Sequence, residues 1–143
     1  KSEEGMEHAL ENWLGCDWVL SLQTTSPFRT SGDSDSAFKL VQKINRNSCV
    51  GVTRVQSLNA GTVQHPFDGD VFNAAAQKQQ RLNASARLSF ALNGAIYLIK
   101  TSQFQSTKRL VDPDTVGIEM SAKTGLDIDT FEDLKSAAEL MGV

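Results

Sequence analysis

A polar segment at residues 23–29 contains side chains that could bind an anionic ligand. Gln23 offers an amide, Thr25 and Ser26 offer hydroxyls, and Arg29 can hold a carboxylate or phosphate through two hydrogen bonds. The segment follows an apolar stretch that is typical of a parallel strand, and ligands of open α/β sheets bind at the carboxyl ends of such strands. The same residues also suit a solvated turn in which Arg29 pairs with a surface carboxylate. Spacing alone leaves both interpretations open.

Asp127 and Asp129 are separated by one residue in a segment of extended character, so we expect their carboxylates on the same side. Two carboxylates at this spacing can hold one hard cation, and Mg²⁺ typically takes one or two protein carboxylates together with phosphate oxygens. In the alternative interpretation, Asp129 is the N-cap of the last helix, Glu132 completes a capping box, and Asp127 faces water.

The other reactive side chains do not form a recognisable catalytic set. His65 precedes Pro66 in a loop, where a lone histidine is more typical of a structural hydrogen bond than of a catalytic base. Cys16 and Cys49 lie beside or inside apolar segments without the spacing of a zinc site, so we expect both to act as small hydrophobic residues. The hydroxyl of Tyr97 could reach a ligand from its strand or lie at the sheet edge.

Apolar periodicity predicts the helices and strands that would position these groups. Helices are expected at 3–14, 34–46 and 130–141, and strands at 18–23, 49–55, 94–100 and 116–120. The strand, helix and strand within 18–55 predict a right-handed βαβ unit of a parallel sheet, with Asp33 or Ser34 capping its helix. Residues 56–90 favour neither a strand nor a helix, and long irregular connections are often functional or oligomeric.

Composition narrows the class of protein. The chain has 143 residues and a formal net charge of −3, which suits one domain and argues against non-specific nucleic-acid binding. No apolar run approaches the ~20 residues that a membrane-spanning helix needs, and residues 1–4 are polar. We therefore expect a soluble cytoplasmic protein that binds neither nucleic acid nor membrane.

Four motifs occur in order along the chain: Leu22-Gln23-Thr24-Thr25-Ser26-Pro27-Phe28-Arg29, His65-Pro66, Asn93-Gly94-Ala95-Ile96-Tyr97, and Leu126-Asp127-Ile128-Asp129-Thr130 followed by Glu132-Asp133-Leu134. In their order and spacing, over about residues 3–141, they resemble the acylneuraminate cytidylyltransferase family, whose members activate sialic and related nonulosonic acids as CMP-sugars.

The resemblance implies a three-layer α/β/α Rossmann-like nucleotidyltransferase fold in which the sugar acid attacks the α-phosphate of CTP and pyrophosphate leaves. It also assigns roles to individual residues. The substrate-binding residues are Gln23, Ser26, Arg29, Asn93 and Tyr97, and the Mg²⁺ carboxylates are Asp127 and Asp129.

Departures from the family pattern lead to further expectations. The usual Arg-Gln followed by Pro is not in place between His65 and Asn93, which leaves Arg81 and Arg87 as candidates for holding the sugar carboxylate. The glycine- and lysine-containing loop that holds CTP is not found, so we expect a chain truncated at its N-terminus, with weak or no activity alone. The alternative function is a non-catalytic binding or oligomerising module. We expect a homo-oligomer that covers the unpaired edge of the strand at 18–23, with 56–90 as its arm.

Overall fold

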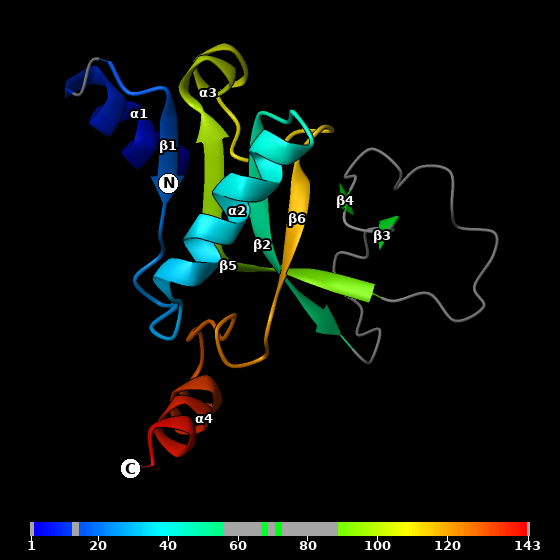
Figure 1. The fold of residues 1–143 in the computed structure, drawn as a ribbon. Helices are drawn as coiled ribbons and strands as arrows, with labels where there is room; N and C mark the ends of the chain where they lie inside the picture. Colours follow the sequence, from blue (N-terminus) through cyan, green and yellow to red (C-terminus); the bar gives the residue numbers. More distant parts are fainter. Residues whose placement is uncertain (1, 13–14, 56–66, 69–70, 73–88, 143) are drawn as a thin grey trace.

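A four-stranded sheet is the centre of the molecule. The computed structural model describes residues 2–12, 15–55, 67–68, 71–72 and 89–142 (Figure 1). In the sheet order β1-β5-β2-β6, both β1 and β2 run antiparallel to β5, and β2 pairs with β6 in parallel. The strands are β1 (Trp18–Ser21), β2 (Ser48–Val55), β5 (Ser89–Lys100) and β6 (Val116–Met120).

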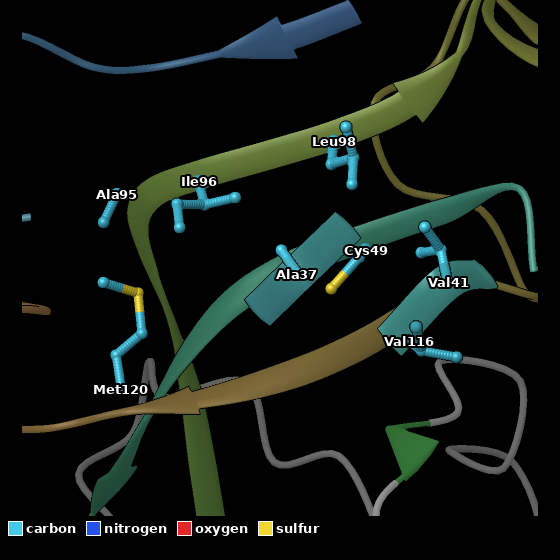
Figure 2. Packing of buried hydrophobic residues seen from close by; sticks show 8 residues of the cluster. All are labelled: Ala37, Val41, Cys49, Ala95, Ile96, Leu98, Val116 and Met120. Atoms are coloured by element: carbon cyan, nitrogen blue, oxygen red, sulfur yellow. The ribbon is translucent and has the colours of Figure 1, made fainter. Parts of the chain in front are cut away.

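Helices cover both faces of this sheet. The helices are α1 (Ser2–Asn12), α2 (Ser31–Lys43), α3 (Thr101–Thr107) and α4 (Phe131–Met141). On one face, α2 packs against a buried cluster that Figure 2 shows from close by: Ala37, Val41, Cys49, Ala95, Ile96, Leu98, Val116 and Met120. On the other face, α1 and α3 pack against β5 through a second buried cluster: Met6, Ile99, Phe104 and Leu110. These layers confirm the predicted three-layer α/β/α class.

The sheet is not the parallel βαβ sheet that the sequence predicts. β1 and β2 run in the same direction and are joined through α2, but β5 lies between them and is antiparallel to both. Apolar strands that are buried on both faces have the same composition in parallel and antiparallel pairs, so the pattern could not separate the two. β1 is an end strand of the described sheet, and among the described residues only β5 pairs with it.

Helices α2 and α4 each have a threonine as their N-cap residue. Thr30 is the N-cap of α2 and forms a capping box with Asp33. Thr130 is the N-cap of α4 and forms a capping box with Asp133. The predicted caps were therefore wrong by a few positions. At the start of α4 this leaves the Asp129 carboxylate outside the capping box.

Several predictions fall on short elements or outside the described residues. α3 was not predicted, since one buried side chain, Phe104, provides its apolar contact. Within 56–90 the structure describes a two-stranded ladder, β3 (Phe67–Asp68) and β4 (Val71–Phe72), and the first two residues of β5, 89–90. His65, Arg81 and Arg87 lie outside the described residues, as does most of the predicted arm. No helix among the described residues is both long and apolar enough to cross a bilayer.

A wide bulge bends β5 in its middle. Val50 of β2 pairs with Tyr97, but Val52 pairs with Leu92, so four residues of β5 lie opposite Gly51 alone. Gly94 occupies the bulge with φ +72°, a conformation that side chains with a Cβ rarely adopt. Figure 2 shows the resulting turn of the strand beside Ala95. The bend directs the backbone around Gly94 toward the segments that follow β1 and β6.

The two cysteines should differ sharply in reactivity. Burial raises the pKa of the Cys49 thiol from its ordinary 9.0 to about 12, whereas Cys16 is partly exposed. In the native protein we expect a disulfide reagent to modify Cys16 and to reach Cys49 only on unfolding. Because the folded-state pKa is raised, the free energy of unfolding should decline between pH 9.0 and about 12. Native-state labelling of a Cys16→Ser variant at the wild-type rate would contradict this assignment.

Candidate functional site

The polar loop after β1 and the aspartate segment after β6 meet in the folded chain. The backbone N–H of Ile128 donates to the carbonyl of Thr25 at 2.9 Å. The buried hydroxyl of Ser26 donates to Asp127 Oδ1 at 3.5 Å. Two segments about a hundred residues apart in sequence are thereby held together, one of them bearing Gln23 and the other bearing Asp127.

Gly94 is where these two segments meet β5. An ideal Cβ added to Gly94 would lie 2.3 Å from Gln23 Oε1 and 3.0 Å from Asp127 Oδ2. The missing side chain thus provides the space in which the Gln23 amide oxygen and the Asp127 carboxylate approach one another. Together with Ser26 Oγ, these atoms form a compact group of oxygen atoms over the bulge of β5.

Arg29 fixes the loop to the bent strand. Its Nη1 donates to the carbonyl of Gln23 at 3.0 Å and to the carbonyl of Ala95 at 2.9 Å. Because Ala95 follows Gly94 directly, this guanidinium holds the start of the loop beside the bulge. The structure therefore gives Arg29 a positioning contact that the sequence analysis did not foresee, beside the substrate-binding role that the resemblance implies.

Both ends of the Asn93 side-chain amide form hydrogen bonds within the protein. Its Nδ2 donates to Thr53 Oγ1 at 3.0 Å, and its Oδ1 accepts from the backbone N–H of Ala95 at 3.1 Å. A Cβ on Gly51 or on Gly125 would lie 2.5 Å from this amide, so two glycines make room for it. Asn93 is only 7% exposed and stabilises the bulge that presents Gly94.

Tyr97 connects the oxygen group with a neighbouring pocket. Burial raises the pKa of the Tyr97 phenol above its ordinary value, and the negative charges of Asp127 and Glu3 raise it further. Tyr97 also lines a pocket of about 320 Å³, within the size range of small-molecule sites. The pocket therefore lies near the Asp127 carboxylate, on the face of the sheet that α1 and α3 cover.

Asp129 is less tightly placed than Asp127. It is exposed, and among the described residues no hydrogen bond or ion pair joins its carboxylate to the loop after β1. Its backbone N–H donates to Asp133 Oδ2 at 3.2 Å, while Thr130 provides the cap of α4. The interpretation of Asp129 as the N-cap is therefore wrong, and its carboxylate remains available for a ligand.

The sequence analysis named most of the residues that the structure brings together. Gln23, Ser26 and Asp127 lie close together, with Asn93 and Tyr97 on the adjoining strand, while their roles in substrate and metal binding stay predictions. Gly94 was missed, although a glycine after an asparagine inside a strand is a known signal for a bulge. Glu3 and Arg109, which also line the pocket, carried no such signal because their segments are distant in sequence.

Comparison with known proteins identifies a solved structure with a similar fold. No protein-family model matches the chain, and no curated protein matches its sequence. Among solved structures, CMP:2-keto-3-deoxy-manno-octonic acid synthetase complexed with CTP is similar, with a TM-score of 0.74 at 14% sequence identity. The likeness covers 99% of this chain and 68% of that one. The chain shares the α/β/α Rossmann-like fold of that synthetase.

Within this fold, Gly94 should be intolerant of a side chain. A Gly94→Ala substitution would strain a φ of +72° and push against Gln23 Oε1. We expect urea unfolding to show a loss of about 1–3 kcal/mol from the backbone strain, with a further contribution because the ends of the Gln23 and Asp127 side chains must shift. Gly142→Ala is the matched control, because Gly142 has φ +75° with nothing within 4 Å of an added Cβ. Equal losses in both variants would show that the approach of Gln23 is unimportant.

The titration of Tyr97 should report the nearby charges, and Tyr97 is the only tyrosine of the chain. Asp127→Asn should lower the Tyr97 pKa, and Glu3→Gln should lower it by less, since Asp127 is the larger of the two electrostatic causes. Ultraviolet absorbance of the phenolate across an alkaline titration measures both shifts. Asp114→Asn serves as the control for the loss of a carboxylate elsewhere. An unchanged pKa in Asp127→Asn would separate Tyr97 from the oxygen group.

Proposed function

We propose that the chain is a cytidylyltransferase of the acylneuraminate type, weakly active or inactive on its own, whose reaction joins CMP from CTP to a sialic-type sugar acid and releases pyrophosphate. The carrying observation is the convergence of Gln23, Ser26 and Asp127 over Gly94. The likeness to a synthetase that was solved with CTP supports the reaction class, and the four motifs of the sequence favour a nonulosonic acid as the second substrate.

Mg²⁺ is the cation that this oxygen group fits best. The described residues contain no group of three or more His, Cys, Asp or Glu side chains able to hold a metal. Asp127 and Asp129 are two carboxylates, and Mg²⁺ is commonly held by only one or two carboxylates together with substrate phosphate oxygens. When bound, the ion would neutralise charge on the phosphates and the leaving pyrophosphate.

The chain's own residues would act mainly by positioning. Nucleotidyl transfer depends on the alignment of nucleophile and phosphate and on charge neutralisation more than on covalent help from the protein. Arg29 holds the loop that carries Gln23 and Ser26, and the bulge of β5 holds Gly94 beneath them. The sugar acid would occupy the pocket beside Tyr97, which places its reacting hydroxyl on the side of Asp127.

Calorimetric titration of the full chain with MgCl₂, CTP and N-acetylneuraminic acid tests this proposal. We expect Mg²⁺-dependent nucleotide binding, and Asp127→Asn and Asp129→Asn should each weaken Mg²⁺ binding by more than about 10-fold, the lower end of what removal of an outer-shell partner costs a metal site. Asp114→Asn, an exposed aspartate paired with Arg46, should bind as the wild type does. Wild-type protein that takes up neither CTP nor sugar acid would refute the proposal.

A non-catalytic oligomerising module is the second candidate, and exposed apolar side chains favour it. Only Ala137 of α4 is buried, and Figure 1 shows α4 apart from the other helices. Exposed apolar residues on α4 and near β1 are Phe131 (65%), Leu134 (50%), Met141 (66%), Leu140 (43%), Leu20 (39%) and Leu22 (42%). A second copy of the chain is the proposed cover. No heat of binding in any of the three titrations, together with a concentration-dependent increase in mass by light scattering, would favour this candidate.

A further inference from the structure

The pocket beside Tyr97 contains two opposite charges that are not paired with each other. Its lining residues are Glu3 from α1, Tyr97 from β5, and Arg109, Leu110 and Val111 from the connection between α3 and β6. In the part of the chain that the structure describes, neither Glu3 nor Arg109 takes part in an ion pair. A pocket with an unpaired cation and an unpaired carboxylate suits a ligand that carries both an acid group and hydroxyls.

The backbone at Arg109 is fixed although its side chain is exposed. Lys108 ends α3 in the left-handed conformation, and its N–H donates to the carbonyl of Phe104 at 2.7 Å. The N–H of Arg109 donates to Thr107 Oγ1 at 3.3 Å, and the next residue, Leu110, is buried. The backbone that carries the guanidinium is therefore fixed, so that only the side chain has to be ordered when a ligand binds.

Helix α1, which carries Glu3, is held to the segment that carries Arg109. Lys108 forms an ion pair with Glu7 of α1. Met6 and Leu10 of α1 pack in the same apolar cluster as Phe104 and Leu110. The two charged walls of the pocket are thus joined through both an ion pair and a shared core.

The charges around the pocket determine where an anion can bind. Glu3 and Asp127 both act on Tyr97 with negative charge, so that end of the pocket repels a carboxylate. Arg109 is the cation among the described lining residues. An acid group would therefore be bound at the Arg109 end, and hydroxyls would face Glu3 and Tyr97, which can accept or donate hydrogen bonds to them.

We propose that Arg109 binds the carboxylate of the sugar acid and thereby orients the substrate in the pocket, with the sugar hydroxyls toward Glu3 and Tyr97. This inference rests on the proposed function, and it assigns the carboxylate contact to a described residue in place of Arg81 or Arg87. Selectivity follows from it. An acid is bound in preference to its neutral ester, because only the carboxylate carries a negative charge shared by two equivalent acceptor oxygens that match the guanidinium.

The test compares N-acetylneuraminic acid and 2-keto-3-deoxy-manno-octonic acid with their methyl esters, by calorimetry on the full chain. Wild-type protein should bind at least one acid more tightly than its ester. Arg109→Ala should weaken binding of that acid about 10- to 100-fold, as expected for loss of a hydrogen bond to a charged group, and leave the ester unchanged. Arg109→Lys should restore part of the affinity, and Glu3→Gln should tighten binding of the acid. Arg46→Ala, which removes an exposed arginine that pairs with Asp114, is the matched control.

Four other outcomes would contradict the inference, and each can be told apart from the rest. Equal affinity of the wild-type protein for acid and ester would exclude carboxylate recognition without involving any variant. An Arg109→Ala variant that binds the acid normally would exclude Arg109, while Mg²⁺-dependent CTP binding would keep the proposed function. If Arg109→Ala instead loses CTP and retains the acid, Arg109 binds phosphate. Failure of the wild-type protein to bind acid, ester and CTP would refute the inference together with the proposed function.

Discussion

The bulge of β5 is the constraint on which the candidate site depends. A regular strand would carry a side chain at position 94 and would keep the loop after β1 away from the segment after β6. Four residues opposite Gly51 and a φ of +72° at Gly94 remove that obstacle, so that Gln23 and Asp127 approach over the glycine. Asn93 and Arg29 supply the hydrogen bonds that an irregular strand would otherwise leave unsatisfied, since they bind backbone groups of Ala95 and Gln23.

The electrostatic character of the site follows from this geometry. Asp127 lies beside other oxygen atoms, and its charge extends to Tyr97 on the same bent strand. Among the described residues, no ion pair or hydrogen bond joins a lysine or arginine side chain to the Asp127 carboxylate. The guanidinium of Arg29 is close in sequence, but its Nη1 donates to two backbone carbonyls. Arg29 therefore positions the loop backbone, and it does not neutralise the charge of Asp127.

Sequence patterns predicted the elements and the oxygen groups, but not the arrangement that unites them. The strand at 116–120 and the helix near 130–141 were predicted nearly to the residue, because their apolar spacing is local information. Strand order was not, since buried strands read alike whether their neighbours run parallel or antiparallel. The pocket was not predictable either. Glu3, Tyr97 and Arg109 come from three segments, and only tertiary packing of α1, β5 and the connection after α3 brings them to one cavity.

The N-cap of α4 shows how one local sequence pattern can fit two roles for the same residue. The sequence analysis set the role of Asp129 as a helix cap against its role as a ligand, because an aspartate before a helix suits both. The structure resolves this competition through hydrogen bonds, since Thr130 and Asp133 satisfy each other's backbone groups at the start of α4. Those bonds lower the pKa of the Asp133 carboxyl, whereas Asp129 contributes only its backbone N–H to the cap. The helix therefore does not need the Asp129 carboxylate, which is exposed one residue beyond Ile128, and its role as a second cation ligand beside Asp127 stays a prediction.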